Sequence, residues 1–256
     1  MMTRIDLNSD MGEWDEPERL AIEAEMMPLI TSVNIACGGH AGTPDLMRRT
    51  AHQATQCGVT IGAHPGFPDR EHFGRTEQNL SSQEIEDLVA NQIQTLATVL
   101  AQDKFTLTHV KPHGALYNMA AKDATIARAI VQAVQAVNRR FVLYALAGSQ
   151  LAKAGQAAGL AVVQEAFVDR AYRADGTLVP RSEEGAVLQN ETKVRRQLHR
   201  LMTGSVLSLD GSSVPIQADS LCLHADTVNA VSLTRMIRHE IQCAGIRIEA
   251  VRHEEP

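Results

Sequence analysis

The stretch that decides the fold is residues 106–118, TLTHVKPHGALYN. It opens with a short run of β-branched and apolar residues, which favours a strand. Because side chains alternate between the two faces of a strand, His109, Lys111 and, if the chain stays extended, His113 share one side. Pro112 cannot donate to a sheet ladder, so we expect the strand to end at about Lys111. Two imidazoles and an ammonium at one strand end indicate either a chemical site or a solvated polar loop.

Strands and helices alternate along the rest of the chain. Strands are predicted at residues 5–10, 32–37, 59–64, 106–111, 141–146, 161–167, 220–226 and 246–251. Helices are predicted at residues 16–27, 44–57, 81–101, 123–137, 149–158, 191–202 and 227–243, with a small hairpin at 205–216. This alternation implies parallel strands joined by crossover helices. Seven or eight such units predict one α/β domain over residues 1–256, a TIM-like (β/α) barrel that is closed or slightly distorted.

Local signals support several of these boundaries. Thr43 precedes Pro44 as an N-cap precedes the first helical position, and Gly58 is placed to end that helix in the left-handed conformation. Ser81 and Glu84 have the spacing of a capping box, so they predict the start of the helix that reaches about residue 101.

Composition excludes several classes of protein. The 44% hydrophobic and 21% charged content is ordinary for a globular chain with a full core, and the net charge of −6 argues against nucleic acid as a partner. No apolar run approaches a membrane span, and the N-terminus lacks the apolar segment of a signal peptide, so we expect a cytoplasmic protein without membrane association. The four cysteines are widely spaced, which argues against a zinc knuckle or a disulfide framework.

Polar side chains end almost every predicted strand, where an α/β barrel carries its active site. They are Asn8, Asp10, Glu13, Asn34, Cys37, His40, His64, Lys111, His113, Glu165, Asp169, Arg170, His224 and Asp226. A single histidine near a strand end is more often a solvated or capping residue. Six strand ends of this kind, brought to one mouth by a barrel, predict a functional site.

The predicted site is rich in carboxylates and imidazoles, and the sequence lacks the P-loop, G-x-G-x-x-G and G-x-S-x-G motifs. A self-contained nucleotide enzyme of the P-loop kind is therefore not expected. Asp10, His40 and His64 could form a metal site of two imidazoles and one carboxylate. They could equally form an acid–base network without metal. The H-x-x-x-H and H-E-x-x-H spacings are absent at these residues, which favours the network, and a divalent metal stays an open question.

Five ordered motifs carry a family resemblance. They are residues 6–13 (DLNSDMGE), 34–42 (NIACGGHAG), 62–69 (GAHPGFPD), 110–118 (VKPHGALYN), and 169–172 (DRAY) with 175–181 (DGTLVPR). With these motifs the sequence resembles the LamB/YcsF family over residues 5–251. The resemblance implies a distorted TIM-like barrel similar to the glycoside hydrolase and deacetylase superfamily. Gly39 stands where the family usually has Phe, and Ala225 and Val228 replace Gly and Pro. We expect these departures to reshape the pocket wall and the loop after the seventh strand.

The resemblance also implies an activity, because this is the family of the A subunit of the prokaryotic 5-oxoprolinase. This enzyme opens 5-oxo-L-proline to L-glutamate with ATP as co-substrate and with partner subunits B and C. A γ-lactam is a poor electrophile whose ring closure is favoured by proximity, so opening it needs an input such as phosphorylation of the amide oxygen. The missing P-loop fits nucleotide handling shared with other subunits. The alternatives are a stand-alone metal-dependent amidase or deacetylase and a non-catalytic carboxylate-binding subunit.

Within this hypothesis the residues take separate roles. Asp10 with nearby Glu13, or His64, is the general base for water. Lys111 and His113 stabilise negative charge on the carbonyl or phosphorylated oxygen, and Arg170 clamps a substrate carboxylate or phosphate. The predicted catalytic residues are thus Asp10, Glu13, His40, His64, Lys111 and His113. The predicted substrate-binding residues are Asn8, Asn34, Glu165, Asp169, Arg170, His224 and Asp226.

Overall fold

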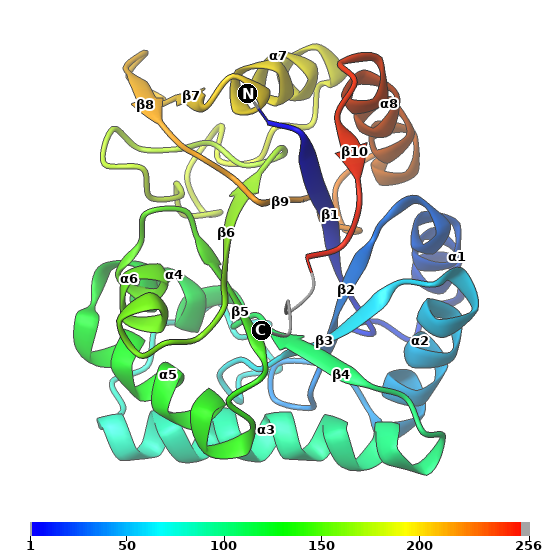
Figure 1. Cartoon of the computed structure of the whole chain (residues 1–256), viewed down its shortest axis with the longest axis vertical. Helices are drawn as coiled ribbons and strands as arrows, with labels where there is room; N and C mark the ends of the chain where they lie inside the picture. The colour runs from blue at the N-terminus through cyan, green and yellow to red at the C-terminus, as the bar shows by residue number, and fades with distance from the viewer. Residues whose placement is uncertain (1, 252–256) are drawn as a thin grey trace.

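The computed structural model describes residues 2–251, so the predicted domain ends, 1 and 256, lie outside the described residues. The barrel strands are β1 (Arg4–Met11), β2 (Ser32–Ala36), β3 (Thr60–His64), β4 (Leu107–Val110), β5 (Val142–Leu146), β6 (Val162–Phe167) and β9 (Ser220–Cys222). These seven strands are parallel and close into a barrel, because β9 pairs with both β6 and β1. The predicted TIM-like α/β barrel is confirmed. Figure 1 shows the strands around a central axis, with helices on the outside.

Apart from α4, the helices match the predicted alternation, and the caps of α2 and α3 match the local signals. They are α1 (Pro17–Met26), α2 (Pro44–Cys57), α3 (Ser82–Gln102), α4 (Gly114–Lys122), α5 (Ala124–Val137), α6 (Gln150–Ala157), α7 (Glu191–Met202) and α8 (Ala230–Cys243), with a 3-10 turn η1 (Met27–Leu29). Thr43 Oγ1 accepts from the Leu46 amide at 3.2 Å, and Ser81 and Glu84 form the reciprocal capping box. Among residues 2–251, no helix is both long and apolar enough to cross a membrane.

Three elements differ from prediction. Helix α4 is not predicted by the local pattern, because Pro112 and Gly114 indicate a turn, yet Gly114 at φ 53° starts a helix directly after the strand. Strand β9 ends at Cys222 rather than 226, because the His224 amide donates to the Asp169 carboxylate at 3.1 Å and the chain leaves the sheet. The predicted eighth strand is present as the short β10 (Arg247–Ile248), which pairs with the start of β1. The predicted hairpin is present as β7 (Ser205–Leu207) and β8 (Ser213–Pro215).

The apolar core lies between the barrel wall and the helices, where Ile35 and Val110 of the strands pack in one cluster with Ile93 of α3. The barrel interior is instead largely polar, with a small apolar cluster of Val142, Tyr144 and Val163. Asp6 is fully buried there, and its carboxylate accepts hydrogen bonds of 2.6 Å from both Thr31 Oγ1 and Ser32 Oγ. Burial raises the pKa of Asp6. A buried polar group without partners would cost several kcal/mol, so these bonds keep the interior stable. The interior is thus a hydrogen-bonded column that leads to the barrel mouth.

Gly62 of β3 makes room for one member of this column, His109 of β4. A Cβ at Gly62 would overlap the His109 ring, whose Nε2 is 3.0 Å from Asn34 Oδ1. Burial lowers the pKa of His109 to about 3, so the ring is neutral. Gly62→Ala is therefore expected to destabilise the fold by about 1–3 kcal/mol in urea unfolding. In the His109→Ala background the ring is absent, so Gly62→Ala should cause no loss of stability from overlap there. An equal loss of stability from Gly62→Ala in the wild type and in the His109→Ala background would contradict this packing.

Candidate active site

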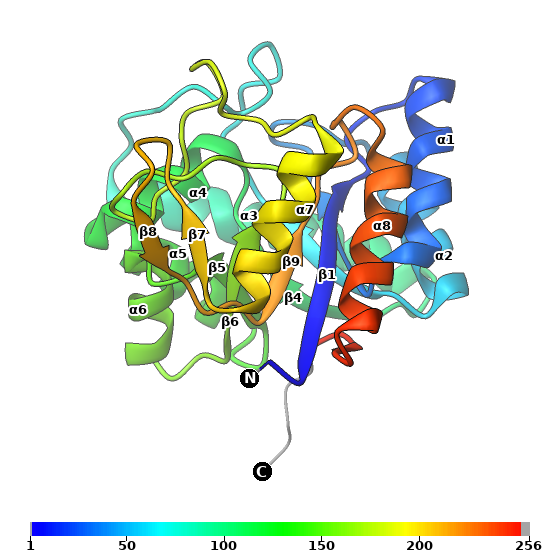
Figure 2. The ribbon, with the colours of Figure 1, turned by 90° about the horizontal axis from the view of Figure 1, so that it is seen from above.

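A cavity of about 460 Å³ opens at the C-terminal ends of the barrel strands. Figure 2 shows the long loops after β3 and after β6, residues 65–81 and 168–190, arching over this end of the barrel. The predicted residues that line the cavity are Asp10, Glu13, His64, Lys111, His113, Arg170, His224 and Asp226. Residues that the sequence did not predict also line it, among them Arg75, Tyr117, Phe167 and Arg181. The barrel thus brings most of the predicted strand-end residues to one place.

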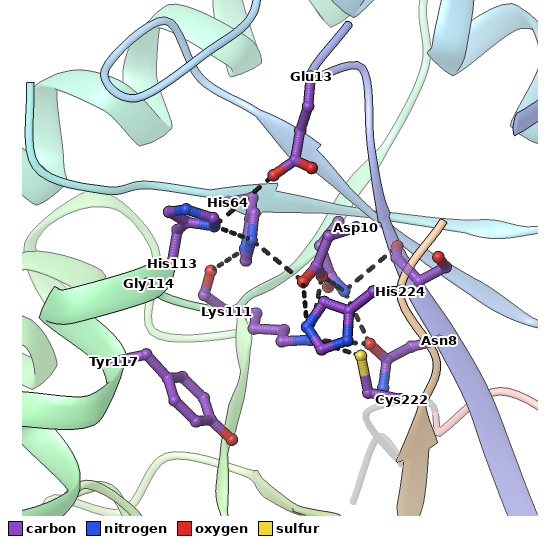
Figure 3. Close-up of polar contacts among 12 residues, drawn as sticks. Asn8, Asp10, Glu13, His64, Lys111, His113, Gly114, Tyr117, Cys222 and His224 are labelled. Atoms are coloured by element: carbon purple, nitrogen blue, oxygen red, sulfur yellow. Dashed lines mark hydrogen bonds and ion pairs between the residues drawn. The ribbon is translucent and has the colours of Figure 1, made fainter. Parts of the chain in front are cut away.

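Lys111 is the centre of the buried charge network, with only 2% of its surface exposed. Its Nζ lies 2.8 Å from Glu165 Oε1, 3.0 Å from Asp10 Oδ1 and 3.1 Å from Asn8 Oδ1. Burial alone would raise the pKa of Asp10, but the charges of His64 and Lys111 hold it well below its usual range. Burial would likewise lower the pKa of Lys111, which the facing carboxylates instead hold well above its usual range. Figure 3 shows Lys111 reaching toward Asp10 and Asn8.

Asn8, Asn34 and Glu165 lie beneath the mouth and bind one another. Asn34 Nδ2 donates to Asp10 Oδ1 at 2.8 Å and to Asn8 Oδ1 at 2.9 Å, while Asn8 Nδ2 donates to Glu165 Oε1 at 2.9 Å. The cavity lining does not include these three residues, which the sequence assigns to substrate binding. Tyr117, which the sequence does not single out, donates its hydroxyl to Glu165 Oε2 at 2.7 Å. These contacts hold the Asp10 and Lys111 side chains in place.

His64 and His113 are held in fixed tautomers by backbone carbonyls. His64 Nδ1 donates to the Lys111 carbonyl oxygen at 2.7 Å, and His113 Nε2 donates to the Phe73 carbonyl oxygen at 2.9 Å. Their remaining nitrogens, His64 Nε2 and His113 Nδ1, face each other at 2.9 Å. Glu13 Oε1 lies 3.6 Å from the same His113 nitrogen. Burial lowers the pKa of His113 well below its usual range.

His40 lies behind this group rather than in the cavity lining. Its ring stacks on His113 with centroids 3.6 Å apart and planes 6° apart, and its Nε2 lies 3.1 Å from Glu13 Oε1. Burial lowers the pKa of His40, so a neutral ring donates from Nε2 to Glu13 and leaves Nδ1 as an acceptor. Within residues 2–251, that Nδ1 is buried without a hydrogen-bond partner. His40 therefore orients Glu13 and His113 and does not face the cavity.

The three departures from the family pattern, Gly39, Ala225 and Val228, lie at different distances from the cavity. A Cβ at Gly39 would overlap the Gly66 carbonyl oxygen and the Gln92 side chain of α3, so Gly39 is fixed by close packing. Gly39 itself does not line the cavity, and its effect on the pocket wall stays a prediction. Ala225 does line it, and Val228 is exposed. Cys37 bonds its thiol to the Ile35 carbonyl oxygen, and burial raises the pKa of this thiol to about 12.

Asp169 and His224 connect the loop after β6 with the end of β9. Asp169 Oδ2 accepts from His224 Nδ1 at 2.9 Å and from Thr227 Oγ1 at 2.7 Å, and Asp169 itself is absent from the cavity lining. Burial would raise the pKa of Asp169, but the charge and hydrogen bonds of His224 hold it below its usual range. Asp169 thus positions His224, whose Nε2 lies 3.9 Å from Asp10 Oδ2.

Three arginines line the cavity, of which one holds a loop in place and two contact the same carboxylate. Arg170 donates to the Val179 carbonyl oxygen at 2.6 Å and the Ala186 carbonyl oxygen at 3.4 Å, so it pins the loop after β6. Arg75 and Arg181 approach Asp226 Oδ2 at 3.1 and 3.2 Å. The sequence places Arg181 in a motif but not in the site, because no local pattern shows which loop arginines turn toward a cavity.

The fold and the mouth together define a parallel (β/α) barrel protein with a buried acid–base cluster beside a small-molecule cavity. The LamB/YcsF family profile matches residues 5–255. The chain belongs to the LamB/YcsF family.

Named relatives cover nearly the full chain. It is 49% identical to the A subunit of 5-oxoprolinase from Heliobacterium modesticaldum, over 96% of this chain and 98% of that one. It is 48% identical to the A subunit of 5-oxoprolinase from Geobacillus thermodenitrificans, over 99% of both chains. Among solved structures, a lactam utilization protein from Thermus thermophilus matches with a TM-score of 0.87 and 39% identity, over 97% of this chain and all of the other. A family 4 carbohydrate esterase from Streptomyces lividans, with a TM-score of 0.51 and 10% identity over 99% and 98% of the chains, shares the fold alone.

Proposed function

We propose that this chain is the A subunit of a cytoplasmic 5-oxoprolinase and works as a single barrel domain together with subunits B and C. The complex would open 5-oxo-L-proline to L-glutamate, coupled to ATP hydrolysis. The observation that carries the proposal is the buried Asp10–Lys111–Glu165 cluster beside a cavity of small-molecule size. The full-length similarity to proteins that are named as the A subunit of 5-oxoprolinase supports it.

Asp10 is the proposed general base. Its Oδ1 is occupied by Lys111 and Asn34, so Oδ2 is the oxygen left to face His64 and His224 at the cavity. Water adds to C5 of the lactam, whose oxygen ATP has phosphorylated, and the water proton passes to Asp10. The C5–N bond then breaks as the new C5 hydroxyl becomes a carbonyl, the proton of that hydroxyl and the proton held by Asp10 pass to the leaving amine, and an acyl phosphate remains. A second water releases phosphate and leaves L-glutamate. Handling of ATP is assigned to the other subunits.

Lys111 acts through Asp10 in this proposal. An ammonium group has three N–H donors, and three oxygens lie within 3.1 Å of Nζ, those of Asp10, Glu165 and Asn8. Its donors are therefore taken up inside the protein, and none is left to contact an oxyanion directly. Lys111 keeps Asp10 ionised and oriented, and its charge stabilises the negative charge that develops nearby.

The pair Arg75 and Arg181 is the proposed carboxylate-binding group of the cavity, in place of Arg170. Two guanidinium groups share the single carboxylate of Asp226, so the group keeps a net positive charge on the cavity wall. A carboxylate or phosphoryl oxygen of the substrate matches that charge and the planar donor geometry of arginine.

Arg181→Met is expected to raise KM for 5-oxoproline roughly tenfold or more, with a smaller change in kcat, because it loses a charge-assisted hydrogen bond of about 1.5 kcal/mol or more. Steady-state kinetics of the assembled complex measure this. Arg173→Met is the matched control, since Arg173 lies on the same loop and pairs with exposed Glu183. An unchanged KM in Arg181→Met, or an equal rise in the control, would remove Arg181 from substrate binding.

Reconstitution tests the function. The purified chain is mixed with 5-oxo-L-proline, with and without ATP and candidate subunits B and C, and glutamate and phosphate are measured. We expect equimolar products only when ATP and all three subunits are present. Turnover by this chain alone, without ATP and lost on chelation, would replace the proposal with a metal-dependent amidase or deacetylase. Full activity of complexes that lack Asp10, His64 and Lys111 would leave the chain as a non-catalytic subunit.

A further inference from the structure

We propose that Glu13, His64 and His113 form a binding site for one divalent transition-metal ion. Glu13 follows β1, His64 ends β3, and His113 lies directly before α4, so three neighbouring strand ends supply the ligands. One ligand atom from each lies within 4.8 Å of the others, and all three residues line the cavity. Figure 3 shows their side chains turned toward one another.

The two imidazoles are prepared for a cation by their hydrogen bonds. A metal-ligating histidine usually donates its other ring N–H to a carbonyl or carboxylate, which fixes the tautomer. His64 Nδ1 does so to the Lys111 carbonyl oxygen at 2.7 Å, and His113 Nε2 does so to the Phe73 carbonyl oxygen at 2.9 Å. The opposite nitrogens, 2.9 Å apart, must share a proton if no cation lies between them. A metal ion takes the place of that proton.

Distances and ring angles agree with this assignment. Tetrahedral ligands with metal–nitrogen bonds of 2.0–2.1 Å lie about 3.3 Å from one another. The His64–His113 separation of 2.9 Å and the Glu13–His113 separation of 3.6 Å lie on either side of this value. The His64 and His113 rings are inclined at 84°, so their planes intersect and can share one ion.

The same geometry excludes two other ligand sets. The His40 ring is parallel to His113 at 3.6 Å, so an ion in the plane of one ring lies well outside the plane of the other. His40 instead donates to Glu13 at 3.1 Å, as an outer-shell residue that orients the carboxylate. A second cluster, Asp10 with Cys222 and His224, has the Lys111 ammonium 3.0 Å from Asp10 and 3.3 Å from Cys222, which repels a cation.

The donor set selects the class of metal. Two imidazoles and one carboxylate suit Zn²⁺, Co²⁺, Mn²⁺ or Fe²⁺ better than Mg²⁺ or Ca²⁺, which prefer oxygen ligands. Three protein ligands leave an open position toward the cavity, where a bound cation would polarise a carbonyl oxygen. Metal binding by these three residues does not depend on the 5-oxoprolinase assignment.

The test is metal binding by the full chain. Chelator-treated protein is titrated with Zn²⁺ and Co²⁺, and bound metal, affinity and Tm are measured. We expect one equivalent per chain and a raised Tm. Glu13→Gln and His113→Ala should weaken binding by more than about 100-fold, and His40→Ala by about 10–100-fold as an outer-shell loss. His199→Ala, which removes an exposed His199–Glu240 pair, is the control and should bind as wild type.

The Co²⁺ absorption spectrum keeps the test decisive even where a variant fails to fold. Nitrogen and oxygen ligands give d–d bands without the thiolate charge-transfer band that Cys222 would add. Absence of tight binding by the wild type, a thiolate band, or unchanged affinity in folded Glu13→Gln and His113→Ala would each overturn the proposal. Circular dichroism of the metal-free variants shows which of them are folded.

Discussion

Lys111→Ala is expected to lower the free energy of unfolding by about 3–5 kcal/mol and to abolish glutamate formation. The change leaves Asp10 and Glu165 buried at the same point without the ammonium that lies 3.0 and 2.8 Å from them. Removing one partner of a buried ion pair is costly because an uncompensated charge remains in a low-dielectric interior. Urea unfolding measures the stability, and glutamate release by the assembled complex measures the activity.

Two variants separate these effects. Lys153→Ala removes an exposed lysine from α6 and should change neither stability nor activity. In the double variant Asp10→Asn/Lys111→Ala, the stability loss should be smaller than the sum of the losses in Asp10→Asn and Lys111→Ala by about 0.5–3 kcal/mol, because the two side chains interact. Glutamate formation should stay absent in that variant. Strictly additive losses would show that Asp10 and Lys111 are not coupled.

Asp10→Asn is expected to reduce kcat by about 10²–10⁴-fold while KM changes little. Asn keeps the size of the side chain and can still accept a hydrogen bond from Lys111, but it cannot take a proton from water. The matched control is Asp175→Asn, at an exposed turn of the loop after β6. Steady-state kinetics of reconstituted complexes compare the two variants with wild type.

A fall of less than tenfold would exclude Asp10 as the general base. A large rise in KM with unchanged kcat would instead assign Asp10 to substrate binding. The gel-filtration profile of each complex shows that the variant chain still assembles with its partners, so that lost assembly is not counted as lost catalysis.

The barrel could be predicted because its signals are local. Alternation over residues 5–10 places Asp6, Asn8 and Asp10 on one face. In the structure this face points into the barrel, where Asp6 accepts from Tyr144 and Asn8 donates to Glu165. Once the strands close into a barrel, their C-terminal ends meet, and Asp10, His64 and Lys111 come within contact of one another without further information.

The features that could not be predicted from the sequence depend on contacts between distant segments. Pro112 and Gly114 indicate a turn in the sequence, but helix α4 begins at Gly114, which has a left-handed conformation. Because the helix is not predicted, Tyr117 is not recognised as a partner of Glu165. Asp169 and His224 are 55 residues apart, and their contact decides where β9 ends. Arg170 faces carbonyl groups of its own loop, and only the folded loop shows this.

The most direct test of the central claim is where 5-oxo-L-proline binds. A crystal structure of the Asp10→Asn chain in its complex, soaked with 5-oxo-L-proline, would locate the lactam. We expect it in the cavity at the barrel mouth, with its carbonyl carbon beside residue 10 and its carboxylate on Arg181. Substrate bound only on one of the other subunits, with this cavity empty at saturating concentration, would contradict the assignment of ring opening to this barrel.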